Sequence, residues 1–202
     1  QCIAETEKRT GSQIVLAVVE RSDSYSELPW KAFALGTSLA GLLVLAMNML
    51  LPLNSETKSL LLSVVMMLSA GAGLALLSVF NPDFARLFLT DHRSEAETKQ
   101  YAESLFLSRE LFATESRRAV LILISLFERR IVVLPDTGLT AQLHKEAADE
   151  IVRNMQTALR AGRLASALEG GLRKLEELIA CDRPPKPSGK ELPNTIIEEK
   201  GA

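Results

Sequence analysis

The sequence is poor in the residue types that most often carry chemistry. Its 202 residues include two histidines, two cysteines and one tryptophan. Cys2 and Cys181 are too few for a zinc site or a disulfide framework. We interpret them as two free thiols, although they would approach each other if the terminal helices packed together. The formal net charge is −2, and the clustered basic surface typical of nucleic-acid-binding proteins is missing, so we expect no nucleic acid partner.

Charge is absent from two long internal stretches. No charged side chain lies between Lys31 and Glu56, or between Lys58 and Asp83. A helix needs about 20 apolar residues to cross the hydrocarbon core of a bilayer. We therefore predict transmembrane helices over 32–53 and 59–80, joined by a tight turn at 54–57. The alternative is a hairpin buried in a soluble core, but the remaining chain is too short to cover two apolar helices on every side.

Small residues in the two spans indicate how the helices could pack. Such residues allow close approach, and van der Waals contact replaces the hydrophobic drive that lipid removes. Counting outward from the turn places Gly36 opposite Ala75, Ala40 opposite Gly71, and Gly41 opposite Ala70. We expect these six residues to form the seam of the hairpin. The alternative is that small residues are simply common in membrane helices.

Residues around the two spans indicate the interface and the orientation. Trp30, Lys31 and Arg86 have the amphipathic character of residues at the membrane surface. Positive residues favour the cytoplasm, and they lie mainly on the domain side of the spans: Arg21, Lys31, Arg86 and Arg93, against Lys58 alone in the connecting loop. We therefore expect a multi-pass protein with its water-facing domain and both termini in the cytoplasm.

The rest of the chain indicates a small α/β domain that the hairpin interrupts. Two uninterrupted apolar runs, at 14–19 and 119–124, are typical of strands buried on both faces, and the short link 127–130 to a third strand at 131–134 predicts a β-hairpin. The first two strands should be parallel and the third antiparallel to the second. Helices are expected at 2–10, from a capping box at Ser94, at 143–159 and at 164–179. The domain should comprise 1–31 and 83–181, with the hairpin at 32–82 and a flexible tail at 182–202.

Several of these segments resemble one family, the TPM domain proteins. The matching segments are 13–25, the stretch 120–138 that includes Phe127-Glu128-Arg129-Arg130 and Pro135-Asp136-Thr137-Gly138, and the later 160–165 and 191–194. The chain resembles a bacterial, membrane-embedded branch with a hydrophobic hairpin after the first strand. This resemblance implies a three-layer α/β fold with a small mixed sheet, and a place in the bacterial inner membrane. It also implies divalent-metal binding or acid phosphatase activity, as in some relatives.

A candidate site follows from the predicted sheet. Ligands of open α/β sheets bind beyond the carboxyl ends of the parallel strands, where we expect Glu20, Asp23 and Glu128. Carboxylates there could hold Mg²⁺ or Ca²⁺, and Arg129 and Arg130 could neutralise a phosphate. The sequence has no glycine-rich phosphate loop that leads into a helix, and neither histidine lies in a recognisable catalytic pattern. The alternative is a solvated cluster of ion pairs.

The same edge could serve a different purpose. The chain passes from the first strand to the first span within about ten residues, so the carboxyl end of that strand should face the bilayer. Arg129 and Arg130 would then lie near lipid headgroups, where each arginine adds about 1 kcal/mol of attraction to an anionic surface. Our leading hypothesis is an interaction or assembly factor for membrane components, with the bilayer and another membrane protein as partners. The alternative is a metal-dependent phosphatase.

Overall fold

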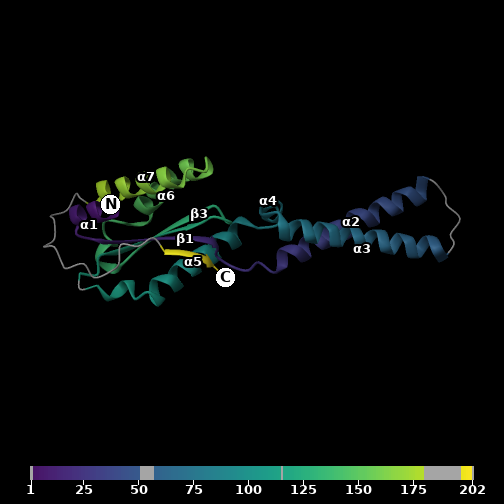
Figure 1. The fold of residues 1–202 in the computed structure, drawn as a ribbon, viewed down its shortest axis with the longest axis horizontal. Helices are drawn as coiled ribbons and strands as arrows, with labels where there is room; N and C mark the ends of the chain where they lie inside the picture. Colours follow the sequence, from purple (N-terminus) through teal and green to yellow (C-terminus); the bar gives the residue numbers. More distant parts are fainter. Residues whose placement is uncertain (1, 51–56, 115, 180–196, 202) are drawn as a thin grey trace. The chain divides into compact units, whose positions relative to one another are not determined.

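The computed structural model describes residues 2–50, 57–114, 116–179 and 197–201. The chain divides into two compact units, Gln1–Asp23 with Ser94–Ala202, and Ser24–Arg93. We call the first the sheet unit and the second the hairpin unit, and describe each by itself (Figure 1). Cys2 begins a helix, whereas Cys181 lies outside the described residues.

The sheet unit is built on a four-stranded mixed sheet in the order β3-β2-β1-β4. β1 (Gln13–Arg21) pairs in parallel with β2 (Ala119–Ser125), and β3 (Arg130–Pro135) pairs antiparallel to β2. These three strands and their directions confirm the fold predicted from the sequence. β4 (Ile197–Gly201) pairs in parallel with the other side of β1. It lies in the segment 182–202, which the composition predicts to be a flexible tail, and residues 182–196 are outside the described part.

Helices cover both faces of the sheet. Successive strand residues face opposite sides, and in this sheet both sides are apolar, so each side packs against helices. Ile14, Val120 and Ile131 pack in one core with α6 (Lys145–Arg160) and α7 (Leu164–Ile179). Val15, Leu121 and Val132 pack in a second core with α5 (Asp91–Ser108) and η1 (Leu111–Ala113). Every residue of β2 is buried, which explains its uninterrupted apolar sequence. The unit therefore has the expected three layers. α1 (Cys2–Thr10) and η2 (Thr137–Leu139) complete it.

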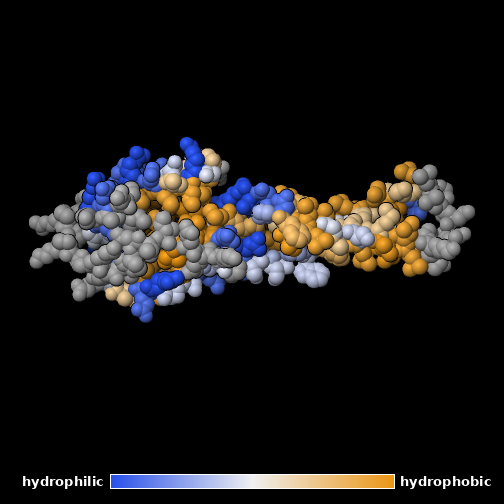
Figure 2. Space-filling model, viewed as in Figure 1, coloured by the Kyte–Doolittle hydropathy of each residue, from blue (hydrophilic) through white to orange (hydrophobic). Residues whose placement is uncertain are grey.

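The hairpin unit consists mainly of two long helices, α2 (Glu27–Leu50) and α3 (Thr57–Phe80), followed by α4 (Pro82–Arg86). Both long helices are apolar and long enough to cross a membrane, and only 6% of the apolar window of each is buried inside the structure. Figure 2 shows hydrophobic residues along much of the visible surface of this unit. An outward apolar surface of this size requires a partner other than water.

The contacts between α2 and α3 differ in register from the pairs predicted by counting outward from the turn at 54–57. Gly36 lies against the backbone of Ala70 and Gly71, about one helical turn from Ala75. The described part of α2 ends at Leu50 and that of α3 starts at Thr57, and residues 51–56, which include most of the turn predicted at 54–57, lie outside the described part.

The start of α5 also differs from the prediction. The sequence 94–97 matches a capping box, but the helix begins at Asp91. Ser94 therefore lies inside the helix, where its side chain is buried and its hydroxyl accepts a hydrogen bond from Arg130 Nε at 2.7 Å. The hydroxyl of Thr98 donates to the carbonyl of Ser94 at 2.7 Å. Ser94 thus connects α5 to β3 instead of capping the helix.

Candidate functional site

The carboxyl ends of β1 and β2 meet at one edge of the sheet, because the two strands run parallel. A four-residue turn, Leu126–Arg129, leads from β2 into β3. The backbone amide of Leu126 donates to the carbonyl of Val19 at 3.0 Å, and that of Phe127 donates to the carbonyl of Glu20 at 2.9 Å. Arg129 has a φ of 53°, the left-handed conformation that closes such turns. The turn is thus folded over the end of β1.

Glu128 is the centre of a buried polar cluster at this edge. Its side chain is nearly buried, with 9% of the residue exposed. One carboxylate oxygen accepts from the backbone amide of Ser22 at 2.9 Å, and the other accepts from the hydroxyl of Ser125, which is fully buried. The hydroxyl of Ser22 is buried and has no hydrogen-bond partner among the described residues. Glu128 therefore joins the end of β1 to the β2–β3 turn.

The three carboxylates predicted as metal ligands do not share this arrangement. Glu20 is exposed and Asp23 is half-buried, while Glu128 is directed at the two serines. Within the described ranges, no group of three His, Cys, Asp or Glu residues lies close enough to hold a metal ion. A metal ion at Glu128 would have to compete with the hydrogen bonds to Ser22 and Ser125. In this structure the Glu128 carboxylate bridges Ser22 and Ser125.

The two arginines of the turn have different surroundings. Arg130 is half-buried, and its guanidinium contacts the Ser94 hydroxyl at 2.7 Å and the Glu95 carboxylate at 3.9 Å. Arg129 is exposed. Together with Leu126, it lines a small open pocket of about 270 Å³ whose other side is the α6–α7 turn. Of the two predicted anion-binding residues, Arg129 is therefore the more exposed.

Residues of the hairpin unit predicted at the membrane interface are placed as follows. Trp30 is 72% exposed and packs edge-to-face on Phe33, with ring centroids 6.2 Å apart. Lys31 donates to the carbonyl of Phe88 at 3.2 Å. Arg86 pairs with Asp83 one turn earlier. Trp30 thus presents its ring outward, while the two cations contact other residues of their own unit.

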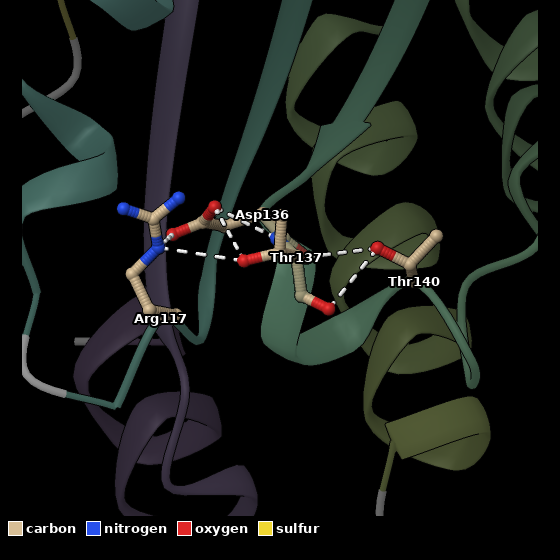
Figure 3. Close-up of polar contacts among 4 residues, drawn as sticks. All are labelled: Arg117, Asp136, Thr137 and Thr140. Carbon is tan, nitrogen blue, oxygen red and sulfur yellow. Dashed lines mark hydrogen bonds and ion pairs between the residues drawn. The ribbon is translucent and has the colours of Figure 1, made fainter.

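A second polar cluster, at the amino end of β2, has no counterpart in the sequence-based site (Figure 3). Asp136 is 3% exposed, accepts from the amide of Thr137 at 2.7 Å, and lies 3.2 Å from Nε of Arg117. The Thr140 hydroxyl donates to the carbonyl of Thr137 at 3.2 Å. The sequence signal was the Pro135-Asp136-Thr137-Gly138 turn, in which an aspartate precedes a short helix as its N-cap.

Gly138 explains why this second cluster is compact. Its amide donates to the carbonyl of Arg117 at 2.9 Å, and a β-carbon at this position would lie 2.5 Å from that oxygen. Only glycine allows the two backbones to come so close. The cluster therefore connects the turn after β3 to the segment before β2.

Comparisons with known proteins agree on the fold. The family model described as "TPM domain" matches residues 79–178. A solved structure, the NMR structure of BA42 protein from the psychrophilic bacterium Bizionia argentinensis sp. nov., is similar with a TM-score of 0.55 and 15% sequence identity. The similarity covers 98% of this chain and 87% of that one. A search of curated proteins finds no match.

Proposed function

Because the chain carries a domain of the TPM family, we propose that it is a membrane-tethered binding module that assists other membrane components. The observation that carries this proposal is the outward apolar surface of α2 and α3, of which only 6% of each apolar window is buried. A lipid bilayer covers such a surface at no cost in exposed apolar area. The helices also lie inside the domain's own sequence, between β1 and α5, so the domain cannot be separated from them.

The surroundings of Glu128 favour binding over catalysis. Phosphoryl transfer needs a metal-activated water or another nucleophile, with positive charge on the phosphate oxygens. Both oxygens of Glu128 accept hydrogen bonds from Ser22 and Ser125, and Arg130 is bound to Ser94 and Glu95. These groups already hold the fold together. We therefore assign the edge a role in contact with the membrane, not in a reaction.

Within this role, Arg129 is the residue that meets lipid. It is exposed, and exposed Leu126 lies beside it on the same small pocket. A cation next to an apolar side chain matches an anionic headgroup above the start of its acyl chain. The sheet unit is on the cytoplasmic side in this proposal, since Lys58, in the first turn of α3, is the single positive residue at the loop end of the hairpin and positive residues favour the cytoplasm.

The tryptophan provides a direct test, because the chain has only one. The full chain is reconstituted in nanodiscs of lipids brominated near the headgroup end of the acyl chain, and the fluorescence of Trp30 is measured. The control is a Trp30→Phe, Leu107→Trp variant, because Leu107 is 63% exposed on α5. We expect strong quenching of Trp30 and weak quenching of the control. Equal quenching of the two would contradict the proposed membrane position.

A second measurement separates binding from catalysis. Melting temperature and phosphate release from p-nitrophenyl phosphate are recorded with and without Mg²⁺ or Ca²⁺, for the wild type and for Asp23→Asn. We expect the metal ions to leave the melting temperature unchanged. We also expect the wild type to release no more phosphate than Asp23→Asn does. Metal-dependent release that disappears in Asp23→Asn would establish the phosphatase alternative, with its predicted Glu20, Asp23 and Glu128 site.

Two further measurements test the lipid contact and the orientation. Anionic lipid in the nanodisc should raise the melting temperature of the wild type more than that of Arg129→Ala. The matched control, Arg153→Ala, removes an exposed arginine of α6 and should respond as the wild type does. An equal loss of the melting-temperature increase in both variants would contradict a specific role of Arg129.

An alkaline phosphatase fused into the 54–57 loop should be active only if that loop lies outside the cytoplasm. An inactive, fully expressed fusion would reverse the orientation.

A further inference from the structure

The outer side of β3 carries backbone groups that no described strand pairs with. β3 is at one end of the sheet order, so only its β2 side is paired among the described strands. The amide of Asp136 donates to the carbonyl of Ala119 at 2.8 Å, and the pairing continues with Leu134 opposite Leu121 and Val132 opposite Leu123. In an antiparallel pair, hydrogen-bonded positions alternate with positions whose backbone groups point away.

The alternation identifies the groups that face outward. Leu134 and Val132 are bonded to β2, so the backbone groups of Ile131, Val133 and Pro135 point away from it. Proline has no amide hydrogen. The outer edge therefore offers two N–H donors, from Ile131 and Val133, and three carbonyl acceptors. Such a row binds another extended chain and little else, because only a strand repeats donors and acceptors at the same spacing.

A groove runs along this edge, with a volume of about 490 Å³. The whole of β3 lines it, α6 forms one wall with Ala148 and Val152, and α5 contributes Glu95 and Lys99. The α6 wall is apolar at these two positions, and the α5 wall is charged. A strand seated in the groove would place alternate side chains on the two walls. The groove therefore suits a segment in which every second residue is apolar.

One basic side chain of the groove, Lys145, favours an acidic residue in a bound segment. It is lined by three basic side chains, Lys99, Arg130 and Lys145, and by two acidic ones, Glu95 and Asp149. Arg130 lies 3.9 Å from Glu95 and Lys99 lies 3.8 Å from Glu103 on the same helix, so each of these two cations already has a carboxylate partner. Lys145 is exposed on the α6 wall, and no residue in the described ranges forms an ion pair with it. An acidic residue of the bound segment would supply that partner.

We propose that this groove binds an extended segment of a partner protein, which adds to β3 as a fifth strand. The segment has apolar residues at alternate positions against Ala148 and Val152, and an acidic residue near Lys145. Its backbone bonds to the outward groups of Ile131 and Val133. This rests on the proposed function as a binding module, and it names the partner's chemistry. Pro135 ends the binding edge, because its missing amide breaks the pattern.

The test uses the full chain in nanodiscs and a fluorescein-labelled peptide with blocked ends, glutamate-threonine-valine-threonine-valine-threonine-glutamate. This sequence reads the same in both directions, so it fits either strand direction. Fluorescence anisotropy should show saturable binding. Methylating the backbone nitrogens of the valine residues in one copy, and of the threonine residues in another, removes one row of donors at a time. One of the two should bind at least about tenfold more weakly, since two hydrogen bonds are lost.

A charge exchange tests the position of the peptide. Lys145→Glu should weaken binding of the glutamate peptide about fivefold, because an attraction becomes a repulsion at an exposed site. The same variant should prefer a peptide with lysine in place of both glutamates. Arg153→Glu makes the same charge change outside the groove and should alter neither peptide's binding.

Four outcomes would overturn the proposal: no saturable binding, equal binding of both methylated peptides and the parent, no response to Lys145→Glu, or pairing of two chains through β3 that blocks the peptide. Quenching of Trp30 is read on the same nanodiscs. A failed peptide experiment with Trp30 quenched as expected therefore rejects the groove alone. Failed Trp30 quenching rejects the membrane-tethered function.

Discussion

Close packing at Gly36 leads to a quantitative prediction for the hairpin unit. A β-carbon added there would lie 2.7 Å from the carbonyl oxygen of Ala70 and 2.9 Å from the Cα atom of Gly71. Ordinary contact begins at 3.4 Å, so α2 and α3 must separate locally by several tenths of an ångström. Both contacted atoms belong to the backbone of α3, so no side-chain rotation relieves the overlap. Gly36→Ala should therefore weaken the packing of the two helices.

The expected magnitude comes from two opposing terms. Overpacking of this kind costs about 1–3 kcal/mol, and alanine gains up to about 1 kcal/mol over glycine in helix propensity. The net loss in free energy of unfolding for Gly36→Ala should thus be about 0–2 kcal/mol. A β-carbon at Gly73 would meet nothing within 4 Å, so Gly73→Ala should be neutral or slightly stabilising. At Gly41 the added carbon meets only the flexible end of Met67, and Gly41→Ala should lie between the two.

The assay is equilibrium unfolding in mixed micelles with increasing sodium dodecyl sulfate, followed by helical circular dichroism. The double variant Gly36→Ala, Ala70→Gly provides a sharper control. Because the clash involves the carbonyl oxygen of Ala70 and not its side chain, removing that side chain should not restore stability. If Gly36→Ala proves as stable as Gly73→Ala, or if Ala70→Gly restores it, the close approach of the two backbones is refuted.

The remaining predictions concern the sheet unit. Glu128→Ala should lower the free energy of unfolding in urea by about 2–4 kcal/mol, because two buried donors lose their acceptor. Glu128→Gln keeps an acceptor oxygen and should lower it by about half as much. An equal loss in both variants would contradict the proposed hydrogen bonds of Glu128. Gly138→Ala should cost about 1–3 kcal/mol, because its β-carbon would lie 2.5 Å from the Arg117 carbonyl; an unchanged melting temperature would refute the close approach. The hydrogen bond to Glu150 raises the pKa of Lys174 above its usual 10.5. The stability that this ammonium group contributes is therefore complete below about pH 10.5 and is lost as the pH rises through the folded-state pKa. When the free energy of unfolding is measured across that pH range, it should decline less in Lys174→Gln than in the wild type.

Much of the sheet could be predicted, because burial on both faces leaves an uninterrupted apolar sequence. Residues 14–19 and 119–124 are all apolar. The first run lies in β1 and the second in β2. β4 gave no such signal. Its sequence, Ile197-Glu198-Glu199-Lys200-Gly201, is mostly charged, and a strand at the end of a sheet does not need apolar residues on both faces. The pairing with β1 is thus decided by backbone hydrogen bonds that composition does not reveal.

The candidate site was less predictable, because its contacts join residues far apart in sequence. The amide of Ser22 and the carboxylate of Glu128 are 106 positions apart. The sequence placed Glu128 at the correct edge of the sheet, since the parallel strands define that edge. It could not show that the carboxylate turns toward Ser22 and Ser125 instead of toward Glu20 and Asp23. Similarly, Ser94 has the local pattern of a helix cap, but a contact with Arg130 from a distant strand uses its hydroxyl.

The order of segments along the chain has a consequence for biosynthesis. β1 lies between β2 and β4 in the sheet, yet both of its neighbours are translated after α2 and α3. When the apolar helices leave the ribosome, β1 has been made but neither strand that pairs with it exists. In the proposed membrane-tethered function, insertion of these helices into the membrane would therefore precede folding of the sheet. Nascent β1 carries Ile14–Val19 without a partner through that interval, and it is the segment in which delayed insertion would lead to aggregation.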